Sequence, residues 1–582
     1  MSSIPFAQAN ISPVEFSGEG ILRLRSAAIV RGWGLVLLVA APAAMAQLPL
    51  PDAGRIQEQL RVPEPPRKPA AAPQIRVEPP AGQAKGDTPP FVVARFRITG
   101  ATLFPEKQLE ELLGEPNRDM TLREAQALAE RISEFYKDRG YLVARALIPA
   151  QDVRDGVVEV RVVEGRYERI DITNASEISE SRIRALLGGV REDAIVHGPT
   201  LERAVLLVSD LAGVQPKATL EPGAQTGYTN LVLEILPTKS AEYDVSLDNG
   251  GSTFTGRYRL SLGATANSPL KIGDRLSGRV VTSGTNLMSW RVAYEAPIGA
   301  SGLRANGYAS ETTYKLGDIY TALNSSGAAR YIGLGAAYPL VRSTPFNLRA
   351  QVNLEAREFE DRIGALDILN EKSAEVIQWG GGGDVRDSLL GGAITAFQGL
   401  VTHGRFVLHT PAQVTADAAT ARTYGNYHKL TIAGNRLQAL GEKLRLVLNY
   451  TGQFAADNLD SSEKFSVGGI SGVRAYPLGE AAGDDVQLIQ AELRYNWGAL
   501  GPGQLTPSFF LDHAKSRLVH ETWEGFVGKN YRSLSGFGFG LEWAIPGSLF
   551  VRGWYAHKLG DEVATADVDK SSRIWVQAGA LF

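Results

Sequence analysis

The most regular feature of the chain is an alternation of apolar and polar residues that recurs from residue 241 to the C-terminus. Apolar side chains occupy every second position over 346–356, 444–450 and 491–497, and the positions between carry mostly Arg, Glu, Asn and Gln. This period of two predicts strands with one apolar and one polar face. No amphipathic helix is convincing in this region, so we expect it to be all β.

A soluble β-sandwich and a membrane β-barrel both fit such alternation. Three features favour the barrel: polar faces that carry Arg and Glu along whole strands, aromatic residues at strand ends, and a last strand that contains Trp575 and ends on Phe582. We interpret Trp575 and Phe582 as a C-terminal signal for the barrel-assembly machinery. At about 10 residues per strand plus loops, residues 239–582 would form roughly 14 to 18 strands.

The segment before the barrel predicts two similar α+β units, at 91–166 and 167–238, that repeat a pattern of helix, glycine, strand, turn and strand. Thr121 and Glu124 have the spacing of a capping box, which marks a helix start. The expected strands are 92–98, 141–148, 157–163, 169–173, 214–221 and 230–236, and the expected helices are 105–113, 121–139, 180–187 and 200–211. This repeat predicts two small domains in tandem.

Residues 47–90 carry a short polar helix followed by a linker. Helical residues are expected at 51–61, within a segment 47–61, and residues 62–90 contain nine prolines, which keep a chain extended. Further upstream, Arg23, Arg25 and Arg31 precede the apolar run 35–40 and the small-residue pattern Ala44-Met-Ala46. This order predicts a signal peptide with an N-terminal extension over residues 1–46.

Composition narrows the function classes further. The 582 residues include no Cys, which removes thiol catalysis and cysteine metal sites, and a net charge of −3 gives no sign of nucleic-acid binding. The seven His form no metal-binding spacing, and the glycine run 380–383 lacks the Lys and Ser/Thr of a phosphate-binding loop. We therefore expect no enzyme activity, no metal and no cofactor.

Two local motifs carry a resemblance to a known family. Residues 468–477 read Gly-Gly-Ile-Ser-Gly-Val-Arg-Ala-Tyr-Pro, and residues 510–514 read Phe-Leu-Asp-His-Ala. Together with Tyr136–Arg145 and Gly165 in the first α+β unit, they resemble the two-partner secretion transporters of the haemolysin secretion/activation type. These transporters belong to the superfamily of outer-membrane barrel-assembly factors. Where the family has Gly, this chain has Ala475 and Ala514. The added methyl groups argue against a close approach of the backbone at these two positions.

The resemblance implies a 16-stranded transmembrane antiparallel barrel preceded by two polypeptide-transport-associated (POTRA) domains in the periplasm. It also implies that the N-terminal helix, with Arg55, Ile56 and Leu60, plugs the pore at rest. In addition, it implies that a long loop carrying Val473, Arg474, Ala475 and Tyr476 folds back onto the barrel-wall residues Phe510 and Asp512. We expect an Arg474–Asp512 pair in a wet lumen, where an ion pair contributes about 1 kcal/mol.

The predicted function is an outer-membrane pore that recognises a large exported exoprotein, such as an adhesin or a haemolysin-like protein, and passes it unfolded to the cell surface. A POTRA strand edge at Arg145, Ala146, Leu147 and Ile148, or one at Lys217–Leu220, would pair with the partner. Outer-membrane lipid and the barrel-assembly machinery are further expected partners. Two alternatives stay open, namely a barrel-assembly or insertion factor of the same superfamily and a passive solute porin.

Overall fold

The fold was obtained as a computed structural model, which describes residues 51–60, 75–77, 89–116 and 118–582. The predicted signal peptide at 1–46 and most of the proline-rich linker lie outside these residues. Within the described part of the chain, no helix is both long enough and apolar enough to cross a membrane.

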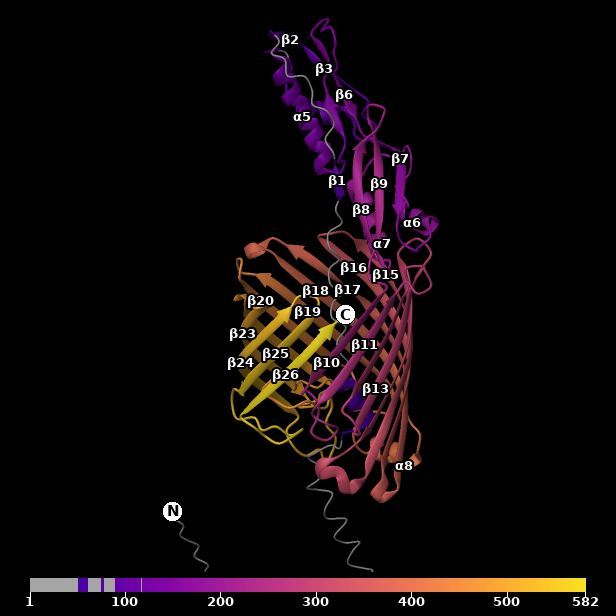
Figure 1. The fold of residues 1–582 in the computed structure, drawn as a ribbon, viewed down its shortest axis with the longest axis vertical. Coiled ribbons are helices and arrows are strands. Elements are labelled where there is room, and N and C mark those ends of the chain that lie inside the picture. The colour runs from indigo at the N-terminus through magenta and orange to yellow at the C-terminus, as the bar shows by residue number, and fades with distance from the viewer. Residues whose placement is uncertain (1–50, 61–74, 78–88, 117) are drawn as a thin grey trace, which may run out of the picture. The chain divides into compact units, whose positions relative to one another are not determined.

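The C-terminal domain is a closed antiparallel barrel of 16 strands (Figure 1). Each strand pairs with the next along the chain, and β10 pairs with β26 to close the ring; β22 is a short extra strand beside β23. The strands are β10 (Ala241–Asp248), β11 (Arg259–Asn267), β12 (Arg275–Thr282), β13 (Leu287–Ile298), β14 (Leu303–Lys315), β15 (Ser325–Arg342), β16 (Phe346–Ile363), β17 (Ile368–Asp387), β18 (Ala393–Leu408), β19 (Gly425–Ala439), β20 (Leu444–Ala455), β21 (Asp485–Tyr495), β22 (Gly498–Leu500), β23 (Gly503–Arg517), β24 (Tyr531–Ile545), β25 (Leu549–Lys558) and β26 (Ser572–Leu581).

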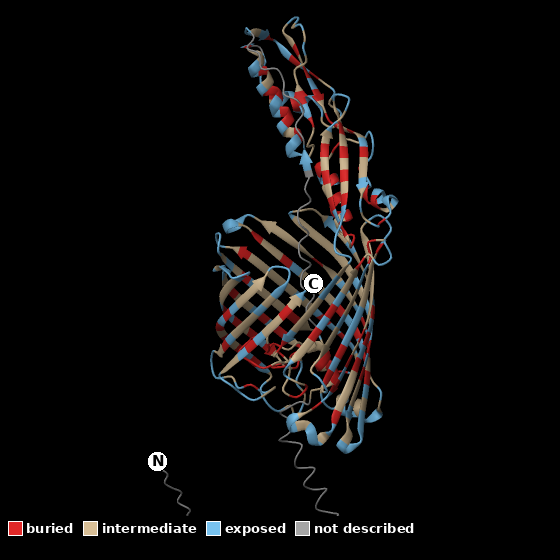
Figure 2. Ribbon diagram, viewed as in Figure 1, coloured by how far each residue is buried: buried red, intermediate tan, exposed pale blue. Residues whose placement is uncertain are grey.

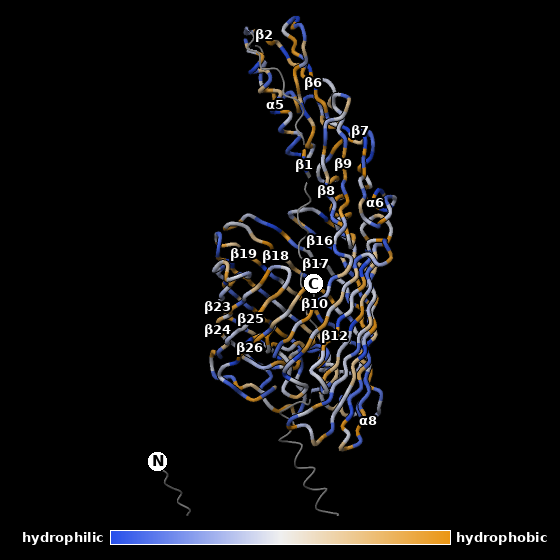
Figure 3. The backbone as a smooth tube through the Cα atoms, viewed as in Figure 1, coloured by the Kyte–Doolittle hydropathy of each residue, from blue (hydrophilic) through white to orange (hydrophobic). Residues whose placement is uncertain are grey.

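The alternation in the sequence corresponds to the two faces of the barrel wall. In β16, Val352 and Leu354 are exposed on the outside, whereas Arg357 on the opposite face is buried inside the barrel. Figure 3 shows hydrophobic and hydrophilic positions following one another along the strands. An apolar outer face and a charged inner face are what a barrel needs when lipid surrounds it and its lumen is polar.

The first α+β unit contains β2 (Phe91–Val93), β3 (Arg95–Thr99), α4 (Glu106–Leu113), β4 (Arg118–Met120), α5 (Leu122–Asp138), β5 (Arg145–Leu147) and β6 (Val157–Val163). The capping box at Thr121 and Glu124 is confirmed at the start of α5. Leu128, Ala129 and Ile132 of this helix pack on the sheet β3–β6–β5, where Figure 2 marks buried residues.

Two strands of this unit differ from the sequence prediction. The expected strand 92–98 is broken at Ala94, because the amides of Ala94 and Arg95 both donate to the carbonyl of Gly156. The expected strand 141–148 shortens to Arg145–Leu147, because Tyr141 and Ala144 form turns that follow the end of α5. The short strand β4 was not predicted.

The second unit contains β7 (Arg166–Asn174), α6 (Glu180–Leu187), α7 (Gly198–Ser209), β8 (Val214–Pro222) and β9 (Tyr228–Pro237). Its helices pack on the sheet through an aliphatic core that includes Ile183, Leu201, Val205 and Leu233. A three-residue strand from the linker, β1 (Ile75–Val77), adds to this sheet in parallel beside β8. No strand was predicted within the linker, and β1 covers the β8 edge of this sheet.

Candidate functional site: the folded loop and the inner barrel wall

The loop between β20 and β21, residues 456–484, forms a compact buried structure of its own. Its residues Val467, Val473, Ala475 and Tyr476 are almost fully inaccessible to solvent. They pack with Val486 and Leu488 of β21, Phe510 and Ala514 of β23, Leu534 of β24 and Ala556 of β25. Because the loop contacts four strands from inside the ring, its position is fixed by the inner barrel wall.

Arg474 at the tip of this loop bonds to Asp512 on β23 in a bidentate arrangement. Its Nε lies 2.9 Å from Asp512 Oδ2 and its Nη2 lies 2.8 Å from Oδ1, and the Arg474 backbone amide also donates to Oδ2 at 3.1 Å. A second carboxylate, Glu492 on β21, accepts from Nη1 at 2.8 Å. The planar guanidinium is the side chain suited to such a two-sided contact.

Aromatic side chains complete the surroundings of Arg474. The Phe510 ring lies under the guanidinium, with 3.4 Å from Arg474 Cζ to the ring centroid, which is a cation–π contact. Trp575 on β26 donates its indole N–H to the Arg474 carbonyl at 2.7 Å. Trp575 therefore points into the barrel, whereas Phe582 is exposed at the end of the chain.

The structure corrects the expectation that the Arg474–Asp512 pair is wet. The Arg474 side chain is 6% exposed and the Asp512 side chain is fully buried. Breaking a buried pair from one side leaves an uncompensated charge and costs about 3–5 kcal/mol, rather than the ~1 kcal/mol of an exposed pair. The contact of Glu492 with Arg474 was not predicted. In the sequence, Glu492 is only one of several charged residues on the polar face of a strand.

Alanine at position 475 is accommodated by a glycine in the opposite wall. A Cβ placed on Gly536 of β24 would lie 2.6 Å from the Ala475 methyl carbon, so the absence of a side chain at 536 makes the room. Gly538 on the same strand makes room in the same way for the Phe510 ring. Close approach of loop and wall is thus preserved, because the small residue is supplied by β24.

Glu480 anchors the other end of the loop tip. Its carboxylate is fully buried and accepts hydrogen bonds from Arg532 on β24, from the amides of Thr565 and Ala566, and from the Thr565 hydroxyl, at 2.6–3.0 Å. These partners belong to β24 and to the β25–β26 loop. The sequence does not reveal this anchor, because a single Glu in a loop belongs to no recognisable motif.

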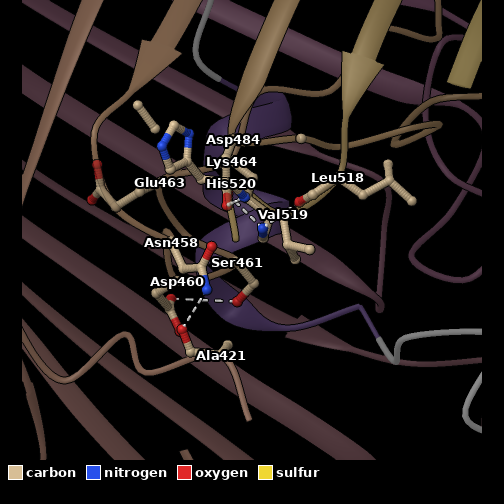
Figure 4. A network of polar contacts seen from close by, with 12 residues as sticks. Ala421, Asn458, Asp460, Ser461, Glu463, Lys464, Asp484, Leu518, Val519 and His520 are labelled. Atoms are coloured by element: carbon tan, nitrogen blue, oxygen red, sulfur yellow. Dashed lines mark hydrogen bonds and ion pairs between the residues drawn. The ribbon is translucent and has the colours of Figure 1, made fainter. Parts of the chain in front are cut away.

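A polar network joins the base of the loop to the neighbouring loop 518–530 (Figure 4). The Lys464 ammonium group bonds to Asp484 at 2.5 Å and to the Leu518 carbonyl at 2.6 Å, and the His520 amide donates to the other Asp484 oxygen at 2.8 Å. Nearby, Asn458 bridges the Ala421 and Glu521 carbonyls. The loop is therefore bonded to the structure along its whole length.

The helix α3 (Ala53–Leu60) lies inside the barrel between the wall and this loop. The Ala53 amide donates to Asp361 on β16 at 2.8 Å, Gln57 accepts from Thr312 on β14, and the Arg55 guanidinium donates to the Gly479 carbonyl of the loop at 3.1 Å. Ile56 is buried and Leu60 is half-buried. The helix is two residues shorter at its start and one at its end than the expected 51–61.

Gly54 sets how closely this helix approaches the loop. A Cβ at position 54 would lie 2.2 Å from the Cβ of Ser462 and 3.2 Å from the Phe359 ring. At the same place, the Lys372 ammonium group of β17 bonds to the Asp460 carboxylate at 3.0 Å and to Ser461 at 3.2 Å. The helix thus fits against the base of the loop only because residue 54 has no side chain.

In the first α+β unit, Tyr136 of the family-like motif bonds to a buried carboxylate. Glu164 accepts from the amides of Thr102 and Leu103 at 2.6 and 2.8 Å and from the Tyr136 hydroxyl at 3.1 Å. Burial opposes ionisation of Glu164, but these hydrogen bonds outweigh it and hold its pKa below the ordinary value. Burial and the adjacent Glu164 raise the pKa of Tyr136.

The two predicted partner-binding edges differ in the structure. β5, with Arg145, Ala146 and Leu147, is the outer strand of its sheet, although the Ala146 amide already donates to Ser133 on α5 at 3.0 Å. Ile148 lies just beyond this strand. The edge at Lys217–Leu220 is occupied by β1, so the expectation of an open edge there is wrong for this state.

The comparisons with known proteins agree with this architecture. The profile of the family described as haemolysin secretion/activation protein ShlB/FhaC/HecB matches residues 227–542, and that of the ShlB-type POTRA domain matches residues 91–165. The heme/hemopexin transporter protein HuxB of Haemophilus influenzae (strain 86-028NP) is 27% identical over 453 residues, which cover 77% of this chain and 80% of HuxB. The outer membrane transporter CdiB of Escherichia coli (strain 536) is 23% identical over 84% of this chain and 85% of CdiB.

Among solved structures, CdiB from Escherichia coli superposes with a TM-score of 0.69 at 18% identity and covers 87% of this chain and 93% of that one. CdiB from Acinetobacter baumannii gives a TM-score of 0.60 at 17% identity, over 94% and 98% of the two chains. These two likenesses concern the fold. The family profile covers more than half of the residues, and the chain therefore belongs to the ShlB/FhaC/HecB family of haemolysin secretion/activation proteins, the outer-membrane transporters of two-partner secretion.

Proposed function

We propose that this transporter exports one large partner protein, which it recognises through POTRA domain 1 and releases at the cell surface. The observation that carries the proposal is the Arg474 site, because it places a whole loop inside the barrel under three ionic contacts. A passive porin would need no such anchored loop inside its lumen. The named relatives support a protein cargo, since one is called a hemolysin transporter.

The resting state in this proposal is closed by α3 and the folded loop together. Helix α3 bonds to the wall through Asp361 and to the loop through Gly479, so the two elements hold each other in the lumen. Export of an extended chain then requires α3 to leave, while Arg474 keeps the loop against β21 and β23. No catalytic step is part of this mechanism.

Recognition is assigned to the β5 edge, because β1 covers the corresponding edge of the second unit. An incoming extended segment would add beside Arg145–Leu147 and gain main-chain hydrogen bonds. The Ala146 amide is shared with Ser133, so a partner that takes this donor competes with a hydrogen bond inside the domain. Because this edge is only three residues long, it offers few main-chain hydrogen bonds. The choice between partner proteins then depends on the side chains beside the edge.

The absence of cysteine makes a direct experiment possible. Single variants Arg145→Cys and Leu147→Cys are incubated with N-terminal fragments of a candidate exoprotein partner, each fragment carrying one Cys at one of a series of successive positions. Strand pairing predicts disulfides that form at every second fragment position and shift in register between the two variants. Glu110→Cys, on the exposed face of α4, is the matched control and should form none.

The alternative of a barrel-assembly factor is tested with the same Cys variants and a second substrate, an unfolded outer-membrane barrel that carries one Cys in its last strand. Cross-links to the last strand of an unfolded outer-membrane barrel, and none to the exoprotein, would overturn the export proposal. Cross-links to the exoprotein fragment that appear without the alternating pattern would leave export intact and reject edge pairing.

A further inference from the structure

The outer face of the barrel carries a groove beside the strands that close the ring. It measures about 500 Å³ and is lined by outward-facing apolar side chains of the first four strands and the C-terminal residue. These side chains are Tyr243, Leu262, Val280, Trp290, Val292 and Phe582. All but Val280 are more than a third exposed, so the groove is open on the side that faces lipid.

The groove exists because one row of the wall has small residues. Tyr243 pairs with Ala264, Ala264 with Gly278, and Gly278 with Val292, so the two middle positions of this row lack bulk. A Cβ placed on Gly278 would meet no atom within 4 Å. Tyr243 and Phe582 form one wall, and Trp290 and Val292 form the other.

The alternation of side chains along the strands shows that the groove lies on the membrane side of the barrel wall. Asp244, between Tyr243 and Val245, pairs with Arg279 at 3.1 Å, and Gly263 faces the same Asp244 carboxylate. Farther along the same face, Asp248 pairs with Arg259 beside Ile470 of the internal loop. That face is the lumen, so Tyr243, Ala264 and Gly278 are on the membrane side.

We propose that this groove binds one acyl chain of a phospholipid from the periplasmic leaflet. The groove starts at Tyr243, the third residue of β10, and at Phe582, so it begins where the second POTRA domain joins the barrel and where β26 ends. The medium on this face is hydrocarbon, and the volume lies within the range of small-molecule sites. The charged residues along the groove, Asp244, Arg279 and Arg291, alternate with its outward-facing residues and direct their side chains to the lumen. The side chains exposed to the membrane are apolar, which selects the tail rather than the headgroup.

The position of the groove gives the bound chain a structural role. β10 and β26 pair through five residues, Asp244 to Asp248 with Leu581 to Gln577, whereas β16 and β17 pair through 18. The groove runs from Phe582, at the end of this short junction, across β10 to β13. A bound acyl chain would therefore support β10 from outside next to the place where the ring is closed by the fewest residue pairs.

The experiment measures retained phospholipid on the full-length protein by native mass spectrometry. The protein in detergent is incubated with 1-palmitoyl-2-oleoyl-phosphatidylethanolamine, and the fraction that keeps one lipid at high collision energy is recorded. Gly278→Leu fills the groove and should lower that fraction at least tenfold. Gly399→Leu is the matched control, because a Cβ on Gly399 of β18 also meets no atom within 4 Å, and it should retain the lipid.

A second filling variant, Ala264→Leu, keeps the test independent of the folding of any one variant, and heat-modifiable mobility checks the barrel in each. Equal lipid retention by the wild type and both filling variants would overturn the proposal. Equal loss from Gly399→Leu would do the same, because it would show nonspecific lipid contact. Preferential retention of lipid A over the phospholipid would contradict the assignment to the periplasmic leaflet.

Discussion

At the residue scale, one arginine connects the loop to the barrel wall. Arg474 contacts Asp512, Glu492, the Phe510 ring and, through its carbonyl, Trp575. The sequence allowed the Arg474–Asp512 pair to be expected, because each residue lies in a recognisable motif. Its burial and its second carboxylate could not be expected, since they depend on which strands lie next to β23 and on the glycines of β24.

We predict that Arg474→Ala and Asp512→Asn each reduce export strongly but leave a heat-modifiable barrel in the outer membrane. Each change strands a buried partner, at a local cost of about 3–5 kcal/mol, while the main-chain ladder of the wall is untouched. Secreted partner in the culture medium is the readout. The double variant should export no less than the poorer single one, because both changes remove the same interaction.

Arg474→Lys provides the matched control for charge. Lysine keeps the positive charge but lacks the planar fork that reaches Asp512 and Glu492 together. Export by this variant should stay well below the wild type. Wild-type export from Arg474→Ala would contradict the anchor, and additive losses in the double variant would show two separate roles.

We also predict that Glu164→Gln destabilises POTRA domain 1. The carboxylate accepts four charge-assisted hydrogen bonds, from the Thr102 and Leu103 amides and the Thr102 and Tyr136 hydroxyls. Each contributes about 1.5–3 kcal/mol, and the amide reproduces them only in part. Limited proteolysis of the full-length protein should cut faster within 91–165. Glu110→Gln, at an exposed carboxylate on α4 of the same domain, is the control and should be cut at the wild-type rate.

The same carboxylate gives a pH dependence of defined sign. Because the folded pKa of Glu164 is lowered, its contribution to stability is present above the unfolded pKa of about 4.3 and is lost as the pH falls through the folded value. Proteolysis by an acid-active protease should therefore accelerate on acidification in the wild type. If Glu164→Gln shows the same acceleration, Glu164 is not its cause.

At the element scale, helix α3 and the linker strand β1 show what the sequence could and could not predict. A short polar helix on a long proline-rich linker was predictable at 51–61. The contacts of this helix were not predictable, because nothing in the sequence shows that Gly54 lies against Ser462. The strand β1 was equally hidden, since Ile75–Val77 carries too few residues for a period to appear.

We predict that Gly54→Leu expels α3 from the lumen and raises single-channel conductance in planar bilayers. A side chain at position 54 overlaps Ser462, whose backbone is fixed by the loop. Deletion of residues 47–61 should have the same effect, and neither change should abolish export. Gly399→Leu, on the lipid-facing side of β18, should conduct like the wild type; an unchanged conductance in Gly54→Leu would refute a resting plug.

At the scale of the whole molecule, the barrel and the two α+β units were predictable because alternation and repeated element order are carried by many residues. The strand number was not, since the residues alone allowed 14 to 18, and the family resemblance supplied the 16 that the structure has. The edge available to a partner also could not be predicted, because it depends on β1 reaching β8. The export mechanism rests on these long-range placements.

The central claim is that the molecule passes a partner polypeptide through its lumen without nucleotide. The most direct measurement reconstitutes the full-length protein in sealed vesicles and adds the urea-unfolded exoprotein fragment outside, in the absence of ATP. We expect that protease-protected fragment accumulates inside the wild-type vesicles and that Arg474→Ala vesicles accumulate far less. Fragment that stays fully protease-sensitive with wild-type vesicles of proven channel activity would contradict the claim.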